Sequence, residues 1–259
     1  MKNKKKYIIY IGIILLSSLI SLGISFIYQE YKRKTIPSVK ELINEKKEKN
    51  YSDKDDYKEQ KKEEISNYTN ELPSYREQYG NPYIMGRLEL PNLNINALVT
   101  RAENNAFYLN NNLYNQYDGL GVPFFDYRNT DLANNKQINI YGHNTRNEKY
   151  FSQLPFINLE AYTDKNIFDN YKDIYLNIDE KKVHYEVIAV KIITDADNEH
   201  MKLIFHSDED FLQHISRLLQ GTLYRNNNIE ITSTDRIIVL QVCHYNPPDT
   251  YLLVIGREK

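Results

Sequence analysis

Three side chains with the chemistry of acyl transfer stand at or just beyond strand-like runs of this sequence. Cys243, the only cysteine among 259 residues, ends the apolar run 236–243, and Arg257 ends the next run, 251–257. His143 follows another apolar segment far upstream. A thiol, an imidazole and a guanidinium are the components of a thiol-dependent acyl-transfer site. Taken singly, a cysteine in a strand is more often a small buried apolar residue, so the hypothesis depends on the joint occurrence of the three.

The N-terminus predicts export of the rest of the chain. Residues 1–6 hold four lysines, and residues 7–28 are uncharged and mostly apolar. That stretch spans about 33 Å as a helix, enough for a bilayer core. Because positive residues stay cytoplasmic, a single-pass anchor in the cell membrane places the remainder outside the cell. A cleaved signal peptide is the alternative. In either case a lone cysteine cannot close an intramolecular disulfide, and catalysis is the leading reason for a free thiol there.

Charge and composition divide the chain into four parts. Residues 1–6 form a basic cytoplasmic tail, residues 7–28 the transmembrane anchor, and the charge-rich residues 29–79 a helical or partly disordered stalk, for which a solvated spacer is the simplest interpretation. Residues 80–259 are long enough for one catalytic domain with a sizeable core. The net charge of −2 gives no field that favours nucleic acid, and the sequence has no nucleotide-binding glycine loop.

Strand-like runs dominate the predicted catalytic domain, and one helix is clear. Ser207 offers an N-cap to residues 208–220, where apolar residues recur at helical spacing, and Gly221 can end this helix. A shorter helical turn is expected near residues 150–156. The predicted strands are residues 83–90, 95–100, 122–126, 137–141, 174–178, 182–191, 236–243 and 251–257. The fold class is therefore mainly β with helices (α+β), a mixed β-barrel decorated by helices and not a doubly wound sheet.

Together these features resemble a sortase, one of the membrane-anchored cysteine transpeptidases of Gram-positive bacteria. Residues 119–129 resemble the "GS-x-F-x-D-x-R-N" segment of class B sortases, and the helix at residues 208–220 before the cysteine strand is similar to a class B feature. The resemblance implies a sortase-like closed β-barrel after an N-terminal transmembrane helix and a charged stalk. One departure stands out. Sortases typically carry Thr-Leu-x-Thr before the nucleophile, whereas Val239 and Val242 occupy the threonine positions here.

The resemblance also implies roles for single residues. Cys243 is expected to be the nucleophile and acyl carrier, His143 to give and take the proton of the amine, and Arg257 to hydrogen-bond the oxyanion. The expected substrate-binding residues are Asn105, Tyr141 and Gln241.

Other polar residues are given weaker interpretations. Asp126 can orient His143 or Arg257, or form a structural salt bridge with Arg128. His244 adjoins the nucleophile but should point to the opposite face of its strand. The remaining histidines show no metal-ligand spacing.

The implied reaction requires no cofactor and no metal. Its partners are exported proteins that bear a sorting motif, and an amine of a cell-wall peptide precursor or of a pilin lysine. Two alternatives remain: a membrane-anchored cysteine protease with water as the acceptor, and a catalytically silent wall-binding scaffold, which Val239 and Val242 make conceivable.

Overall fold

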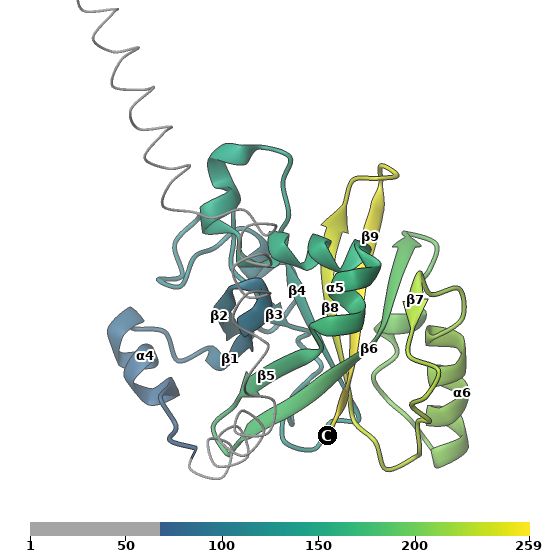
Figure 1. The fold of residues 1–259 in the computed structure, drawn as a ribbon. Helices are drawn as coiled ribbons and strands as arrows, with labels where there is room; N and C mark the ends of the chain where they lie inside the picture. Colours follow the sequence, from purple (N-terminus) through teal and green to yellow (C-terminus); the bar gives the residue numbers. More distant parts are fainter. Residues whose placement is uncertain (1–67) are drawn as a thin grey trace, which may run out of the picture. The chain divides into compact units, whose positions relative to one another are not determined.

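The computed structural model of the protein describes residues 68–259, whose strands close into a barrel (Figure 1). Hydrogen-bonded neighbours follow the order β5-β1-β2-β3-β4-β8-β9-β6, and β5 also pairs with β6, which closes the circle. The strands are β1 (Ile84–Leu90), β2 (Ile95–Thr100), β3 (Phe124–Phe125), β4 (Gln137–Gly142), β5 (Asp173–Asn177), β6 (Lys182–Thr194), β8 (Ile237–His244) and β9 (Thr250–Glu258). The short strand β7 (Tyr224–Arg225) pairs only with β6, outside the circle.

Alternation along β8 gives the barrel an inner and an outer face. Ile238 and Leu240 are fully buried in the interior, and successive strand residues point to opposite sides. The outer residues Ile237 and Val239 are also buried, because a helix covers them. Both faces of β8 are therefore apolar at its start, and only its end is free to carry polar residues.

The covering helix is α6 (Asp208–Leu218), which packs on the outer face of β6, β8 and β9. The side chain of Ser207 accepts a hydrogen bond from the backbone N–H of Asp210 at 3.1 Å, and three acidic residues occupy the first turn. Phe211, Ile215 and Leu218 face the barrel. The helix predicted from residue 208 onward is confirmed, and Gly221 follows it with a positive φ of 70°.

Shorter helices cover other parts of the barrel. The 3₁₀ segments are η1 (Pro91–Leu93), η2 (Phe107–Leu109), η3 (Glu148–Gln153), η4 (Pro155–Thr163) and η5 (Glu199–Met201), and α5 (Lys165–Asn170) follows η4. In α4 (Leu72–Tyr79), Leu72 is buried, and Arg76 donates to the carbonyl of Ile84 and pairs with Asp179. Helix α4 therefore packs on the same domain as β1.

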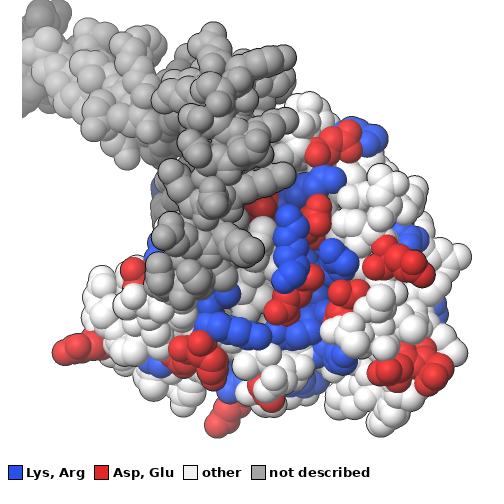
Figure 2. Space-filling model, turned by 60° about the horizontal axis from the view of Figure 1, so that its bottom comes forward, with Lys and Arg blue, Asp and Glu red and all other residues white. Residues whose placement is uncertain are grey.

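The end of the barrel near the C-terminus carries a band of Lys and Arg side chains interrupted by Asp and Glu (Figure 2). Ion pairs near this end join Arg236 to Glu258 at 2.8 Å and Arg257 to Asp235 at 3.9 Å. Because the two signs alternate, the band is an internally paired surface and gives no extended field of one charge.

All eight barrel strands were predicted from the sequence, and the closed barrel is confirmed. The two-residue strand β7 and helix α5 were not predicted, and helix α4 lies within residues 29–79, where a helical or partly disordered stalk was expected. The proposed anchor, residues 7–28, lies outside the described residues, as does most of the stalk. Between residues 68 and 259, no helix has both the length and the apolar character needed to cross a bilayer.

Candidate active site

The parallel pairing of β4 with β8 brings the predicted histidine and cysteine to one end of the barrel. In this register Tyr141 lies opposite Gln241 and Gly142 opposite Val242. His143 and Cys243 are the next residues of the two strands, so they follow at the same edge. Two segments far apart in sequence thus meet because neighbouring parallel strands end together.

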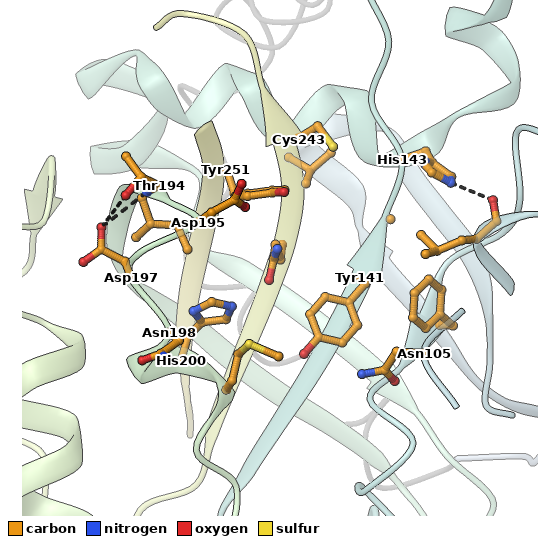
Figure 3. Close-up of a pocket in the computed structure, with 17 residues that line it drawn as sticks. Asn105, Tyr141, His143, Thr194, Asp195, Asp197, Asn198, His200, Cys243 and Tyr251 are labelled. Carbon is orange, nitrogen blue, oxygen red and sulfur yellow. Dashed lines mark hydrogen bonds between the residues drawn. The ribbon is translucent and has the colours of Figure 1, made fainter. Parts of the chain in front are cut away.

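A pocket of about 400 Å³ opens on the outer face of the barrel at this edge (Figure 3). The site residues predicted from the sequence line it with one exception, Arg257. The pocket is lined by Asn105, Leu109, Phe124, Tyr141, Gly142, His143, Ile193, Thr194, Asp195, Asp197, Asn198, His200, Met201, Gln241, Val242, Cys243 and Tyr251. Its wall combines the ends of β4, β6 and β8 with the start of β9 and the loops beside them.

Cys243 is half-buried in this pocket, and its surroundings favour the neutral thiol. Burial raises the pKa of the Cys243 thiol above its ordinary value, and the negative charges of Asp195 and Glu160 add to the increase. The strand end itself is held in place, because the Asn144 side chain donates to the carbonyl oxygen of Cys243 at 2.9 Å. The same amide group donates to Glu160 at 3.0 Å.

His143 is oriented by the loop after β2. Its Nε2 lies 2.8 Å from the carbonyl oxygen of Leu109, an atom that can only accept a hydrogen bond (Figure 3). The imidazole must therefore carry its hydrogen on Nε2. This tautomer leaves Nδ1 as the nitrogen that can take up a proton.

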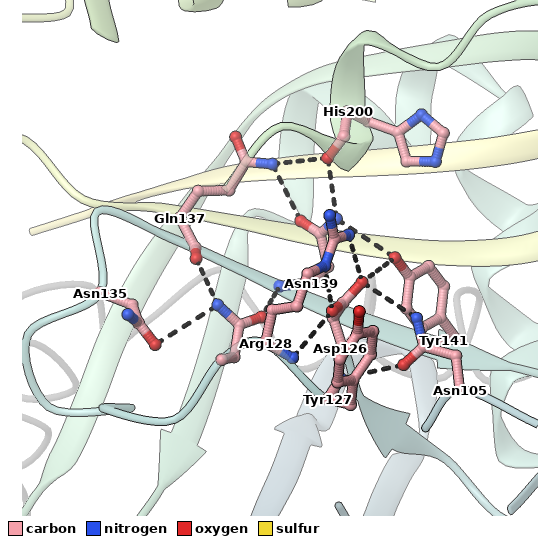
Figure 4. Close-up of polar contacts among 10 residues, drawn as sticks. Asn105, Asp126, Tyr127, Arg128, Asn135, Gln137, Asn139, Tyr141 and His200 are labelled. Atoms are coloured by element: carbon pink, nitrogen blue, oxygen red, sulfur yellow. Dashed lines mark hydrogen bonds and ion pairs between the residues drawn. The ribbon is translucent and has the colours of Figure 1, made fainter. Parts of the chain in front are cut away.

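The candidate substrate-binding residues Asn105 and Tyr141 are tied together by the fully buried carboxylate of Asp126 (Figure 4). Oδ2 of Asp126 accepts from the Tyr141 hydroxyl at 2.8 Å and from Nδ2 of Asn105 at 3.1 Å. Arg128 donates to both carboxylate oxygens, at 2.8 and 2.7 Å. Of the alternatives for Asp126, the structure has the salt bridge with Arg128.

This network sets the charge state of Asp126. Burial alone would raise its pKa, but hydrogen bonds from Arg128, Tyr141 and Asn105 outweigh burial and lower the pKa below the usual range. Asp126 is therefore a charged residue that supports the pocket wall from behind.

A row of polar side chains on the outer face of β4 fixes the opposite wall of the pocket. Gln137 and Asn139 are buried and both donate to the backbone carbonyl of His200, at 2.7 and 2.8 Å (Figure 4). They hold η5, which brings His200 to the pocket. Next to it the Gln241 side chain interacts with the His200 imidazole, and Oε1 of Gln241 is buried at the pocket wall.

The prediction that Arg257 shares this site is wrong. Strands β8 and β9 are antiparallel, and their register pairs Cys243 with Tyr251 but Arg257 with Ile237. At about 3.4 Å per residue, the six steps from residue 237 to residue 243 put Arg257 about 20 Å from the thiol along the sheet. Arg257 instead lies near Asp235 at the charged end of the barrel. The end of β9 is the end farthest from the nucleophile.

Sequence reasoning missed the residue that does lie opposite Cys243. Tyr251 lies near the start of β9 and lines the pocket, with Asp195 of the loop after β6 beside it (Figure 3). A signal was present: two strands joined by the short turn 245–249 form a hairpin, so the partner of Cys243 must lie at the start of the next run. His244 lies on the opposite face, as alternation predicts, with Nδ1 2.8 Å from Glu160.

Comparisons with known proteins agree on one family. No protein-family model matches the chain. The chain is 27% identical over 163 residues to sortase B of Listeria monocytogenes, a match that covers 63% of this chain and 63% of that relative. The X-ray structure of Clostridium perfringens sortase B superposes with a TM-score of 0.66 at 25% identity and covers 73% of this chain and 99% of that one. The Staphylococcus aureus sortase B–substrate complex superposes with a TM-score of 0.63 at 23% identity, covering 72% and 83%. The sequence match thus spans a little under two thirds of the Listeria relative, and the fold match nearly all of the Clostridium chain.

Proposed function

The chain is a member of the sortase family, and from this premise we propose that it is a cysteine transpeptidase. It cleaves a sorting motif in an exported protein, holds the acyl fragment as a thioester on Cys243 and passes it to an amine. The amine belongs to a cell-wall peptide precursor or to a pilin lysine. The enzyme acts outside the cell, attached to the membrane by residues 7–28.

The meeting of His143 and Cys243 at the edge of one pocket is the observation that carries this proposal. In the first half-reaction Sγ of Cys243 gives its proton to Nδ1 of His143 and bonds to the carbonyl carbon of the substrate. The C–N bond then breaks, and the amine nitrogen leaves with the proton from His143. In the second half-reaction the acceptor amine gives a proton to His143, a new C–N bond forms, the C–S bond breaks, and His143 returns its proton to Sγ of Cys243.

The resting pair is neutral in this proposal. The pKa of the Cys243 thiol is raised by burial and by the carboxylates near it, and Nε2–H of His143 is directed to a carbonyl. The thiol therefore loses its proton as the substrate arrives and is not held in advance as an ion pair with imidazolium.

The substrate chain lies along the pocket wall. The side-chain amide of Gln241, at the pocket wall, hydrogen-bonds the backbone of the motif. Tyr141 and Asn105, held by Asp126, shape the wall on the other side. The substrate complex solved for the Staphylococcus aureus enzyme supports a peptide ligand for this fold.

The test uses purified full-length protein, a sorting-motif peptide library and triglycine as the acceptor. Mass spectrometry should find an acyl adduct on Cys243 and a peptide extended by triglycine, and Cys243→Ala should form neither while it keeps its melting temperature. Cleavage with water as the sole acceptor, even at high triglycine, would identify a protease. A thiol that alkylates but forms no acyl adduct with any peptide would indicate a silent scaffold.

A further inference from the structure

Apart from the imidazolium that forms at His143 during the reaction, the pocket lining holds no cationic side chain that could stabilise the negative charge of the reaction. Among its lining residues, all within the described part of the chain, there is neither lysine nor arginine. The tetrahedral stage nevertheless places negative charge on the former carbonyl oxygen, and without a directed donor that charge is costly in a site from which water is excluded. A neutral N–H or O–H group of the pocket must fill this role.

Three neutral donors of the pocket already serve the protein. The Tyr141 hydroxyl and the Asn105 amide donate to the buried Asp126, whose charge depends on them. The hydroxyl of Thr194 donates to Asp197 in its own loop. Redirecting the first two would leave a buried carboxylate short of partners, which is expensive.

Tyr251 differs from these donors in position and in partner. It is the residue directly opposite Cys243 in the β8–β9 ladder, so the two side chains stand on the same face with their Cβ atoms about 5 Å apart. Figure 3 shows both over the pocket, with Asp195 beside Tyr251. The carboxylate beside it, Asp195, belongs to an exposed residue of the loop after β6. Water can satisfy that carboxylate at little cost when the phenol turns to another acceptor.

The geometry points to Tyr251 as the group that donates a hydrogen bond to the carbonyl oxygen of the substrate as Cys243 attacks it. The O–H turns about the Cζ–O bond from Asp195 to the oxyanion. No proton changes owner in this step: the Sγ–C bond forms, the carbonyl π pair moves to oxygen, and the phenol keeps its hydrogen. When the C–N bond breaks, the carbonyl reforms and the O–H returns to Asp195. Asp195 is the positioning residue that holds the phenol over the pocket between turnovers.

A phenol suits the charge of this site. The interaction with Asp195, burial and the charges of Asp195 and Cys243 raise the pKa of Tyr251, so the phenol is protonated at neutral pH. It brings no positive charge, which agrees with a thiol that rests in its neutral form. This inference rests on the proposed transpeptidase function.

The test is Tyr251→Phe in the full-length protein, assayed with the peptide that the wild type cleaves in the library screen and with triglycine. Removal of the hydroxyl keeps the ring, and loss of an oxyanion donor typically lowers kcat by about 100-fold, with at least about tenfold expected for a neutral donor. KM, the melting temperature and the rate of alkylation by iodoacetamide should stay at wild-type values. A merely structural hydroxyl would change the melting temperature before it changed kcat alone.

Tyr224→Phe is the matched control, because it removes a hydroxyl that donates to the carbonyl of Thr163 outside the pocket; its kcat should equal that of the wild type. If Tyr251→Phe turns over at the wild-type rate, or raises KM at constant kcat, the donor role is overturned while the transpeptidase function stands. If the wild type itself forms no acyl adduct, the proposed function fails, and the inference with it.

Discussion

At the scale of the residue, the site is distinguished by the negative charges that surround the thiol of Cys243. Cys243 is partly buried and faces carboxylates, not cations, so its surroundings oppose ionisation. In the proposed reaction such a thiol would gain selectivity at the expense of resting reactivity, because few thiolates would exist until a substrate and His143 act together. The charge of Asp195 contributes directly to the raised pKa of the thiol, and its contribution can be tested by mutation.

Asp195→Asn should lower the pKa of Cys243. The negative charge of Asp195 raises that pKa in the wild type, so its removal favours the thiolate. Rates of iodoacetamide alkylation measured from neutral to strongly alkaline pH should show a wild-type midpoint above about 8.5, the value for a free cysteine, and a lower midpoint in the variant. Asp197→Asn is the control, since Asp197 does not contribute to the shift. An identical midpoint in wild type and Asp195→Asn would contradict the electrostatic account.

Asp126→Asn should destabilise the fold by about 3 kcal/mol, the cost of breaking a buried ion pair. The depressed pKa of Asp126 gives stability that is present above about pH 4, the ordinary value for an aspartate, and is lost as the pH falls through the lower folded value. Urea denaturation at pH 7 and at pH 3 should show a smaller difference between variant and wild type at pH 3. Asp179→Asn, in an ion pair that is about a third exposed, should cost much less.

At the scale of the element, register decides what a sequence can predict. The strands could be predicted because their apolar residues either alternate with polar ones or form continuous apolar runs. The parallel pairing of β4 with β8 then brings together residues at the ends of these two strands. The position of Arg257 could not be read in the same way. The last residue of a strand lies beside the last residue of a parallel neighbour, but beside the first residue of an antiparallel neighbour. In the hairpin of β8 and β9, Tyr251 is the neighbour of Cys243. Strand β7 was not predicted, because two residues are too few to show an alternation of apolar and polar side chains.

Arg257→Lys should leave transfer nearly unchanged. Arg257 lies opposite Ile237, about 20 Å along the sheet from the thiol, so its guanidinium cannot reach the acyl group. We expect kcat/KM within about twofold of wild type, the range of a change that touches no reacting group. A loss of tenfold or more in the transfer assay, with an unchanged melting temperature, would show that the register assigned to β9 is wrong.

Gly142→Ala should distort the end of β4. A Cβ at this position would lie 2.4 Å from Cγ of the buried Phe156 ring, so the strand or the ring must move. Overpacking of this kind costs about 1–3 kcal/mol, and the adjacent His143 would shift with the backbone. Calorimetry and the transfer assay should show a lower melting temperature and reduced kcat. Gly119→Ala is the control, because no atom lies within 4 Å of its Cβ position.

At the scale of the molecule, the described domain contains every residue that the proposed chemistry needs. The pocket is built from β4, β6, β8 and β9 and the loops beside them, and residues 68–79 pack on the same barrel. The predicted anchor would supply location and contribute nothing to catalysis.

Deletion of residues 1–28 should therefore move the protein from the membrane fraction to the soluble fraction with kcat/KM unchanged within about twofold. The predicted anchor, residues 7–28, is long enough for a bilayer core and would account for membrane retention. Cell fractionation and the transfer assay measure both properties. A shortened protein that still sediments with membranes, or one that is folded but inactive, would contradict the division of the chain into anchor and enzyme.

The place of β9 in the sheet also determines when the pocket can form during synthesis of the chain. Last of the barrel strands in chain order, β9 sits between β8 and β6, and β8 joins it to the rest of the circle. A growing chain that has completed only β1 to β6 holds His143 but neither the thiol nor Tyr251, and one that ends after β8 leaves the circle open. Because domains form as units during synthesis, the pocket is complete only after β9 has joined the sheet, and the proposed acyl transfer would begin only then.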